Sequence, residues 1–208
     1  MAYSYTGVFP NQQLKNSGVF TTADALNLQA VGEWGDSLEL IQTQTVSSAV
    51  AQVDFTSIKE SAYDVHLLQL NNFETVSGTN ILNLRFSNDS GSSYESSNYQ
   101  YAMQRFGTTF TERRSTSASE ITYLATKDST NVYQVYIYLY NLGNSSKYSF
   151  ITNQSPVGVD GSNIFGYFGG GIYAVAETIN ALRILNSTGA NFTQGTAKLY
   201  GIKQIWVT

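Results

Sequence analysis

The chain alternates apolar and polar positions over much of its length, with the period of two residues that is typical of half-buried β-strands. Residues 132–140 show the clearest alternation. Aliphatic and aromatic residues fill one face of this segment, and the other face holds Gln134, Tyr136, Tyr138 and Tyr140. This second face is therefore either buried as well or a tyrosine surface.

Similar patterns predict ten to eleven strands, at residues 38–45, 48–55, 62–70, 81–86, 98–105, 121–125, 132–140, 147–152, 164–173, 178–185 and 197–207. Clusters of Asn, Gly and Ser separate these segments, as at residues 141–146 and 186–191. Strands do not alternate with helices, which disfavours parallel α/β folds. We therefore expect an all-β fold, a jelly-roll-like antiparallel β-sandwich over residues 37–208.

Residues 1–36 lack any sustained period and are expected to form an N-terminal arm or adaptor segment. Thr22 fits the N-cap of a brief helix over residues 23–31, with Asp24 in its first turn and Gly32 after its end. Two interpretations stay open: an arm that docks on a larger assembly, or an ordered strand of the main domain.

Composition narrows the range of functions. Only 12% of the residues are charged, whereas Ser, Thr, Asn and Gln supply 75 of the 208 residues. The net charge of -4 gives no basic footprint, so nucleic acid is not an expected partner. Cys is absent, which excludes disulfides and thiolate metal sites. No apolar run reaches 18 residues and no secretory signal is recognisable, so we expect no membrane insertion.

Residues 87–94 resemble an Asp box, the S-x-D-x-G-x-T-W hairpin of sialidases and related propellers, with Ser for Thr and Tyr for Trp. The Asp89 carboxylate would accept hydrogen bonds from the turn, and Gly91 would supply a positive φ. We expect a structural hairpin, and the alternative is a weak Ca²⁺ site at Asp89 and Glu95.

Catalytic chemistry has little support in this sequence. His66 is the only histidine; it lies mid-strand next to Asp64, in a setting that favours a structural or interface role. No G-x-S-x-G elbow occurs, and no facing pair of carboxylates is marked. Glu33, Asp36 and Glu39 cluster near the first strand, where a solvated edge explains them. We expect no catalytic, cofactor-binding or metal-ligating residues, no cofactor, and no enzyme activity.

Two further runs are expected to be structural. Residues 166–171 are rich in glycine but fit no phosphate-binding or dinucleotide-binding motif, so they indicate a bulge or a close crossing of strands. The basic pair Arg113–Arg114 is expected in a solvated loop. For Tyr136, Tyr138 and Tyr140, three settings stay open: a carbohydrate-stacking surface, an oligomer interface, or an inner sheet face.

Five segments together resemble structural proteins of tailed bacteriophages, especially marine and cyanobacterial phages. These segments are residues 35–46, 53–58, 84–87 leading into the Asp-box-like turn, 99–102 and 195–202. The resemblance covers about residues 35–206. It implies a virion protein of the head-decoration, head-fibre or tail-fibre type, and it carries no shared catalytic residues.

The resemblance also implies a place and a set of partners. The chain would be made in the host cytoplasm, released by lysis, and assembled with other capsid or tail proteins. Because phage appendages are commonly symmetric trimers, a homo-oligomer, specifically a homotrimer, is expected. We therefore predict a non-enzymatic virion structural protein. The alternative is a receptor-binding module that recognises host surface glycan, and a glycan-degrading enzyme is the least favoured reading.

Overall fold

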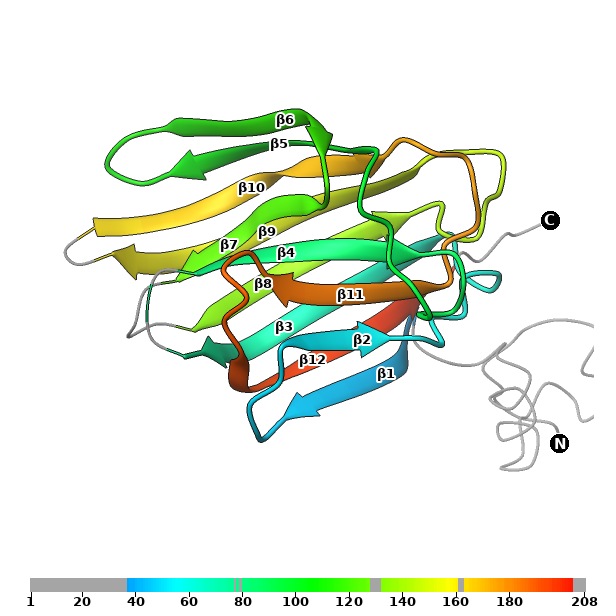
Figure 1. Ribbon diagram of the computed structural model, residues 1–208, viewed down its shortest axis with the longest axis horizontal. Helices are drawn as coiled ribbons and strands as arrows, with labels where there is room; N and C mark the ends of the chain where they lie inside the picture. Colours follow the sequence, from blue (N-terminus) through cyan, green and yellow to red (C-terminus); the bar gives the residue numbers. More distant parts are fainter. Residues whose placement is uncertain (1–36, 77, 79, 128–131, 161–162, 204–208) are drawn as a thin grey trace, which may run out of the picture. The chain divides into compact units, whose positions relative to one another are not determined.

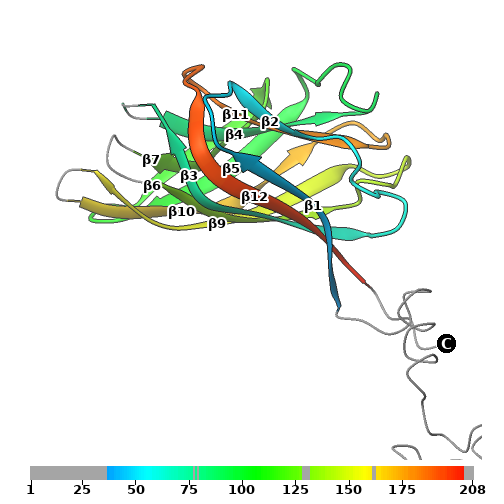
Figure 2. The same ribbon diagram turned by 90° about the horizontal axis from the view of Figure 1, so that it is seen from below.

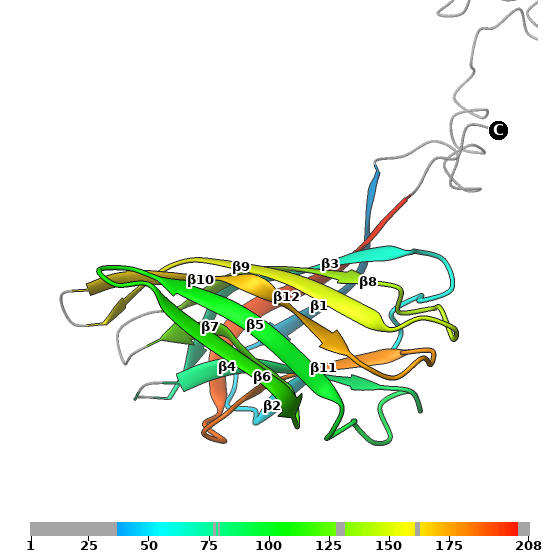
Figure 3. The same cartoon turned by 90° about the horizontal axis from the view of Figure 1, so that it is seen from above.

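The structure is a computed structural model that describes residues 37–76, 78, 80–127, 132–160 and 163–203. The arm predicted at residues 1–36, its short helix, Glu33 and Asp36 lie outside the described residues. Within the described part the chain forms two antiparallel β-sheets that face each other, so the expected all-β class and sandwich are confirmed. Figure 2 and Figure 3 show the two layers from the side.

The large sheet has eight strands. In spatial order they are β1 (Leu38–Val46), β12 (Phe192–Ile202), β3 (Val65–Thr75), β8 (Tyr133–Tyr140), β9 (Ser149–Asp160), β10 (Asn163–Tyr173), β5 (Tyr99–Phe106) and β6 (Thr111–Ala118). The small sheet has four strands, in the order β2 (Gln52–Phe55), β11 (Ala181–Asn186), β4 (Asn80–Ser87) and β7 (Ile121–Lys127). Figure 1 shows the small sheet lying across the large one.

Strand pairing identifies the topology as a jelly roll. Strand β1 pairs with β12, β2 with β11, β3 with β8, and β4 with β7. In the sequence, each pair encloses the next one, as in a single long hairpin. In space, successive pairs alternate between the large and the small sheet. Eight strands in two sheets are the elements of a jelly roll. The remaining strands form two extra hairpins, β5–β6 and β9–β10, which extend the large sheet past β8.

The core lies between the two sheets, on the apolar face that the alternation marks in most strands. In β4, Leu82, Leu84 and Phe86 are fully buried, whereas Arg85 on the opposite face is half-buried. In β5, Tyr99 and Met103 are buried in the same way. The Tyr99 hydroxyl accepts a hydrogen bond from the backbone N–H of Phe86, 2.8 Å away, and so ties β5 to the opposite sheet.

The glycine-rich run lies inside β10, where the expected close crossing is present, whereas the bulge lies in the neighbouring strand. The partners of Phe165 and Tyr167 in β9 are Gly158 and Ser155, so the extra residue of the bulge belongs to β9 and lies opposite Gly166. A Cβ at Gly171 would lie 2.9 Å from Cγ2 of Ile121 in the small sheet. Glycine at this position therefore lets the two sheets approach closely.

Strand β6 is the main element that the sequence pattern missed. Its sequence, TERRSTSA, has no apolar face, and it forms one of the two free edges of the large sheet. Charged side chains on an edge strand disfavour pairing with another chain. The prediction that Arg113–Arg114 lies in a loop is consequently wrong, since both residues are in this strand. The guanidinium of Arg113 lies over the ring of Tyr123, 5.3 Å from its centre.

Candidate functional site

The outward side of β8 is a tyrosine surface, which eliminates the inner-face alternative for this strand. Tyr136 and Tyr138 are 44% and 40% exposed, and Tyr140 is half-buried. The other face of β8 packs into the core through Val135, Ile137 and Leu139, among others. A row of phenol rings on an open sheet face offers flat apolar area with a polar edge, which suits contact with protein or sugar.

Neighbouring strands continue this surface across the sheet. Leu67 of β3 lies opposite Tyr138, and Tyr200 of β12 lies opposite Leu67. Leu40 of β1 lies opposite Tyr200 and is 51% exposed. We call the outward side of these four strands the apolar half of the large sheet. Its apolar residues are Leu38, Leu40, Val65, Leu67, Tyr136, Tyr138, Tyr140, Tyr200 and Ile202.

Few charges interrupt the apolar half. Among its outward, described side chains the charged ones are Lys198 and Glu74, which have opposite sign and are both half-buried. The remaining polar positions are uncharged, as at Gln69 and Thr43. Two such surfaces could meet without a net repulsion of like charges.

The outward side of the small sheet has the opposite character. Arg183 of β11 donates two hydrogen bonds of 2.8 Å to the Asp54 carboxylate of β2, and its guanidinium lies 3.8 Å from the centre of the Tyr94 ring. Arg85 donates to Glu120 at 2.9 Å. These charges already have partners within the chain, so this face is a less suitable place for extensive apolar contact.

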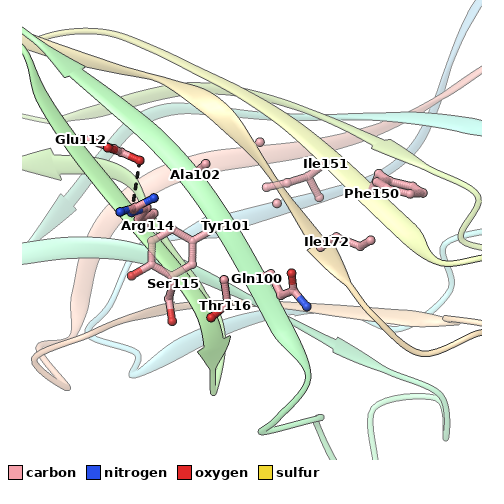
Figure 4. A pocket seen from close by; sticks show the side chains of 12 residues that line it. Gln100, Tyr101, Ala102, Glu112, Arg114, Ser115, Thr116, Phe150, Ile151 and Ile172 are labelled. Carbon is pink, nitrogen blue, oxygen red and sulfur yellow. Dashed lines mark ion pairs between the residues drawn. The ribbon is translucent and has the colours of Figure 1, made fainter.

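A groove crosses the other half of the large sheet, over the two extra hairpins. Its volume is about 570 Å³, and its outward lining includes Gln100, Ala102, Arg114, Phe150, Gly170 and Ile172. We call it the hairpin groove. Figure 4 shows Phe150 and Ile172 on one side of it and the Glu112–Arg114 ion pair on the other. The sequence did not predict this groove, because it depends on the alignment of two hairpins that are separated in the chain.

The Asp-box-like turn holds together through the hydrogen bonds that its sequence suggests. Asp89 accepts one bond from the Ser93 N–H, at 2.9 Å, and one from the Ser93 hydroxyl, at 2.6 Å. Ser87 donates to the same carboxylate at 2.7 Å. These bonds, those from Ser93 foremost, lower the pKa of Asp89 to about 2. Gly91 has the expected positive φ of 87°.

The expectation that this turn closes a hairpin is wrong. The turn follows β4 in the small sheet and leads toward β5 in the large sheet, so it crosses between the layers. Tyr94 still anchors the segment, through its ring contact with Arg183. For the alternative Ca²⁺ site, the described residues contain no group of three His, Asp or Glu side chains placed to hold a metal ion.

His66 lies on the inward face of β3 and is fully buried, so the apolar side of the sequence pattern, Val65 and Leu67, is the outward one in this strand. The Nε2 atom of His66 is 2.8 Å from the Ile58 carbonyl oxygen. Burial lowers the pKa of this imidazole below its usual 6.5. The ring therefore serves as a neutral hydrogen-bonding group of the core.

Glu39 is the described member of the predicted acidic cluster, and it is held by neighbouring side chains. It accepts hydrogen bonds from Tyr63 and Lys59, which lower its pKa to about 2. The Lys59 ammonium lies 3.0 Å from its carboxylate, and Lys203 lies 3.5 Å away. This arrangement ties β1 to the segment before β3 and leaves the carboxylate ionised.

The comparisons with known proteins leave the chain without an assigned family. No family model, no curated protein and no solved structure matches it. In the described part of the chain, no helix is long and apolar enough to cross a membrane. The function must therefore be inferred from the two outer faces of the sandwich and from the hairpin groove.

Proposed function

We propose that this chain is a non-enzymatic structural protein of a bacteriophage virion, a head-decoration, head-fibre or tail-appendage component, and that it assembles into a homo-oligomer. The observation that carries the assembly proposal is the apolar half of the large sheet. Four adjacent strands present leucine, valine, isoleucine and tyrosine outward, although the same strands already bury a complete inner face.

A second copy of this chain is the partner that fits the apolar half best. The charges of its Lys198 and Glu74 side chains sum to zero, so two copies that associate through this surface experience no net repulsion. Tyrosine and aliphatic residues with few charges are the composition of buried interface centres. A homotrimer is the arrangement we propose, in keeping with the phage resemblance of the five segments.

The virion setting rests on that resemblance, and the physical character of the chain supports it. A sandwich without cysteine, with few charges and an outer surface rich in Ser, Thr, Asn and Gln needs no oxidising compartment for its stability. The proposed partners are other capsid or tail proteins, and the proposed location is the particle, after synthesis in the host cytoplasm and release by lysis.

Immunogold electron microscopy tests the virion proposal. Antibody against the full-length protein is applied to intact phage particles from a culture that expresses the chain. We expect gold on the particles: over the head for a decoration or head-fibre protein, or on the tail for an appendage. Particles that stay unlabelled while the infected cells contain the protein would overturn the proposal.

A further inference from the structure

The hairpin groove adjoins the apolar half, because Phe150 of β9 lies opposite Tyr140 of β8, but it is built on strands that the jelly roll itself does not include. Its lining comes from the hairpins β9–β10 and β5–β6, which extend the large sheet beyond β8. Figure 4 shows the side chains that line it. A depression on the face of a sheet, lined by apolar and polar side chains, is a suitable place for a ligand.

Small residues make the floor of the hairpin groove. Gly170 of β10 lies opposite Ala102 of β5, and both residues line the groove. Both lie on the outward face, and neither is large enough to fill the space above the sheet. In the next row, Ile172 lies opposite Phe150 and Gln100, so larger side chains border this floor.

The two walls of the groove differ in chemistry. Phe150 is 42% exposed and, together with Ile172, gives one wall a flat apolar surface. On the other wall, the Nε of Arg114 lies 3.4 Å from Oε1 of Glu112, and both side chains are more than half exposed. Gln100 and Thr116 add exposed groups that can both donate and accept hydrogen bonds.

We propose that the hairpin groove binds a neutral saccharide. A pyranose ring has an apolar face of C–H groups that can lie on an aromatic ring, and a rim of hydroxyls that both donate and accept. The groove provides a matching phenyl ring at Phe150 and mixed donors and acceptors at Gln100 and Thr116. The Glu112–Arg114 pair sums to zero charge, so the electrostatics of the groove suit an uncharged ligand.

This binding does not depend on the assembly proposal. The apolar half is formed by β1, β12, β3 and β8, whereas the groove is formed mainly by β9, β10, β5 and β6. A protein that assembles but binds no saccharide would overturn only the groove proposal. A protein that binds saccharide as a monomer would overturn only the assembly proposal.

The test uses the full-length protein and a panel of soluble oligosaccharides, neutral hexose hexamers beside galacturonic acid hexamers, followed by calorimetry on the neutral oligosaccharide that binds best. Phe150→Ala removes the proposed stacking surface and is expected to weaken binding about tenfold or more. Ala102→Trp fills the floor of the groove and is expected to abolish binding. Both changes lie on the outward face, so the thermal unfolding temperature of each variant should stay close to that of the parent.

Phe168→Ala is the matched control. Phe168 is 48% exposed on the same sheet face but does not line the groove, so its removal should leave the affinity within about twofold. The proposal is overturned if no neutral oligosaccharide binds, if only the galacturonic acid hexamers bind, or if Phe168→Ala weakens binding as much as Phe150→Ala does.

Discussion

At the scale of single residues, a leucine side chain contributes much more to the stability of the fold on the inner face of the sandwich than on its outer face. Leu84 of β4 is fully buried between the sheets, whereas Leu40 of β1 is 51% exposed on the apolar half. Removing a buried leucine side chain loses the transfer free energy and leaves a cavity. Removing an exposed one changes little within the folded chain.

We therefore expect Leu84→Ala to lower the free energy of unfolding by about 2–5 kcal/mol. Leu40→Ala is expected to change it by less than about 0.5 kcal/mol, measured by urea unfolding at a concentration where the chain is monomeric. Equal losses in the two variants would contradict the assignment of inner and outer faces.

His66 gives a second residue-scale prediction, on pH dependence. Burial lowers the pKa of this imidazole in the folded protein below its ordinary 6.5. As pH falls through the unfolded-state value, the unfolded chain gains a proton that the folded chain does not, so stability is lost below about pH 6.5, by at most about 1.4 kcal/mol per pH unit.

The measurement is urea unfolding between pH 7.5 and 5.5. His66 is the only histidine, and the ordinary pKa values of Glu39 and Asp89, 4.5 and 3.8, lie below this pH window, so the stability that their lowered pKa values provide is lost mainly at lower pH. We expect the stability of the parent to fall and that of His66→Gln to stay level. A parallel decline in both proteins would show that another group is responsible.

At the scale of elements, the contact between β10 and β7 fixes how closely the sheets approach. A Cβ at Gly171 would lie 2.9 Å from Cγ2 and 3.1 Å from Cδ1 of Ile121. Gly171→Ala is therefore expected to lower the free energy of unfolding by about 1–3 kcal/mol, as overpacking does.

A double-mutant cycle tests this prediction. Ile121→Ala removes the clashing atoms and alone should cost about 2–5 kcal/mol through its cavity. The double variant should cost less than the two single changes together, because the added methyl group partly fills that cavity. Strict additivity in thermal or urea unfolding would mean that the two residues do not limit the approach of the sheets.

The elements also show which features a sequence can predict. The alternation of apolar and polar residues predicted β8 and its tyrosine face, because a strand that is buried on one side has this period of two in its own sequence. It missed β6, whose polar and charged residues leave no apolar face to recognise. It also could not show that the turn around Asp89 crosses between sheets, since local hydrogen bonds there do not specify which strand follows in space.

The candidate sites were harder to predict than the fold class. Tyr138 could be singled out from its own strand, but its neighbours Leu67, Tyr200 and Leu40 come from positions as far apart as 40 and 200 that only the register brings together. The hairpin groove likewise needs Gly170 placed opposite Ala102, from two hairpins separated in the chain. The pairing register between distant strands cannot be predicted from the sequence of any single strand.

At the scale of the whole molecule, the two outer faces of the sandwich differ in chemical character. The small sheet holds its charges in internal pairs such as Arg183–Asp54, whereas the large sheet presents a nearly uncharged apolar half. An exposed apolar surface of this kind on a folded domain marks an interaction site. The proposed assembly therefore requires that copies of the chain associate through that face.

Analytical ultracentrifugation of the full-length protein, beside Tyr138→Glu and Phe110→Glu, tests this claim most directly. Tyr138 lies in the apolar half, and the 76% exposed Phe110 lies between β5 and β6, away from it. We predict that the parent and Phe110→Glu sediment at three times the mass of one chain and that Tyr138→Glu sediments as a folded monomer. A monomeric parent, or a Tyr138→Glu variant that remains oligomeric, would contradict the account.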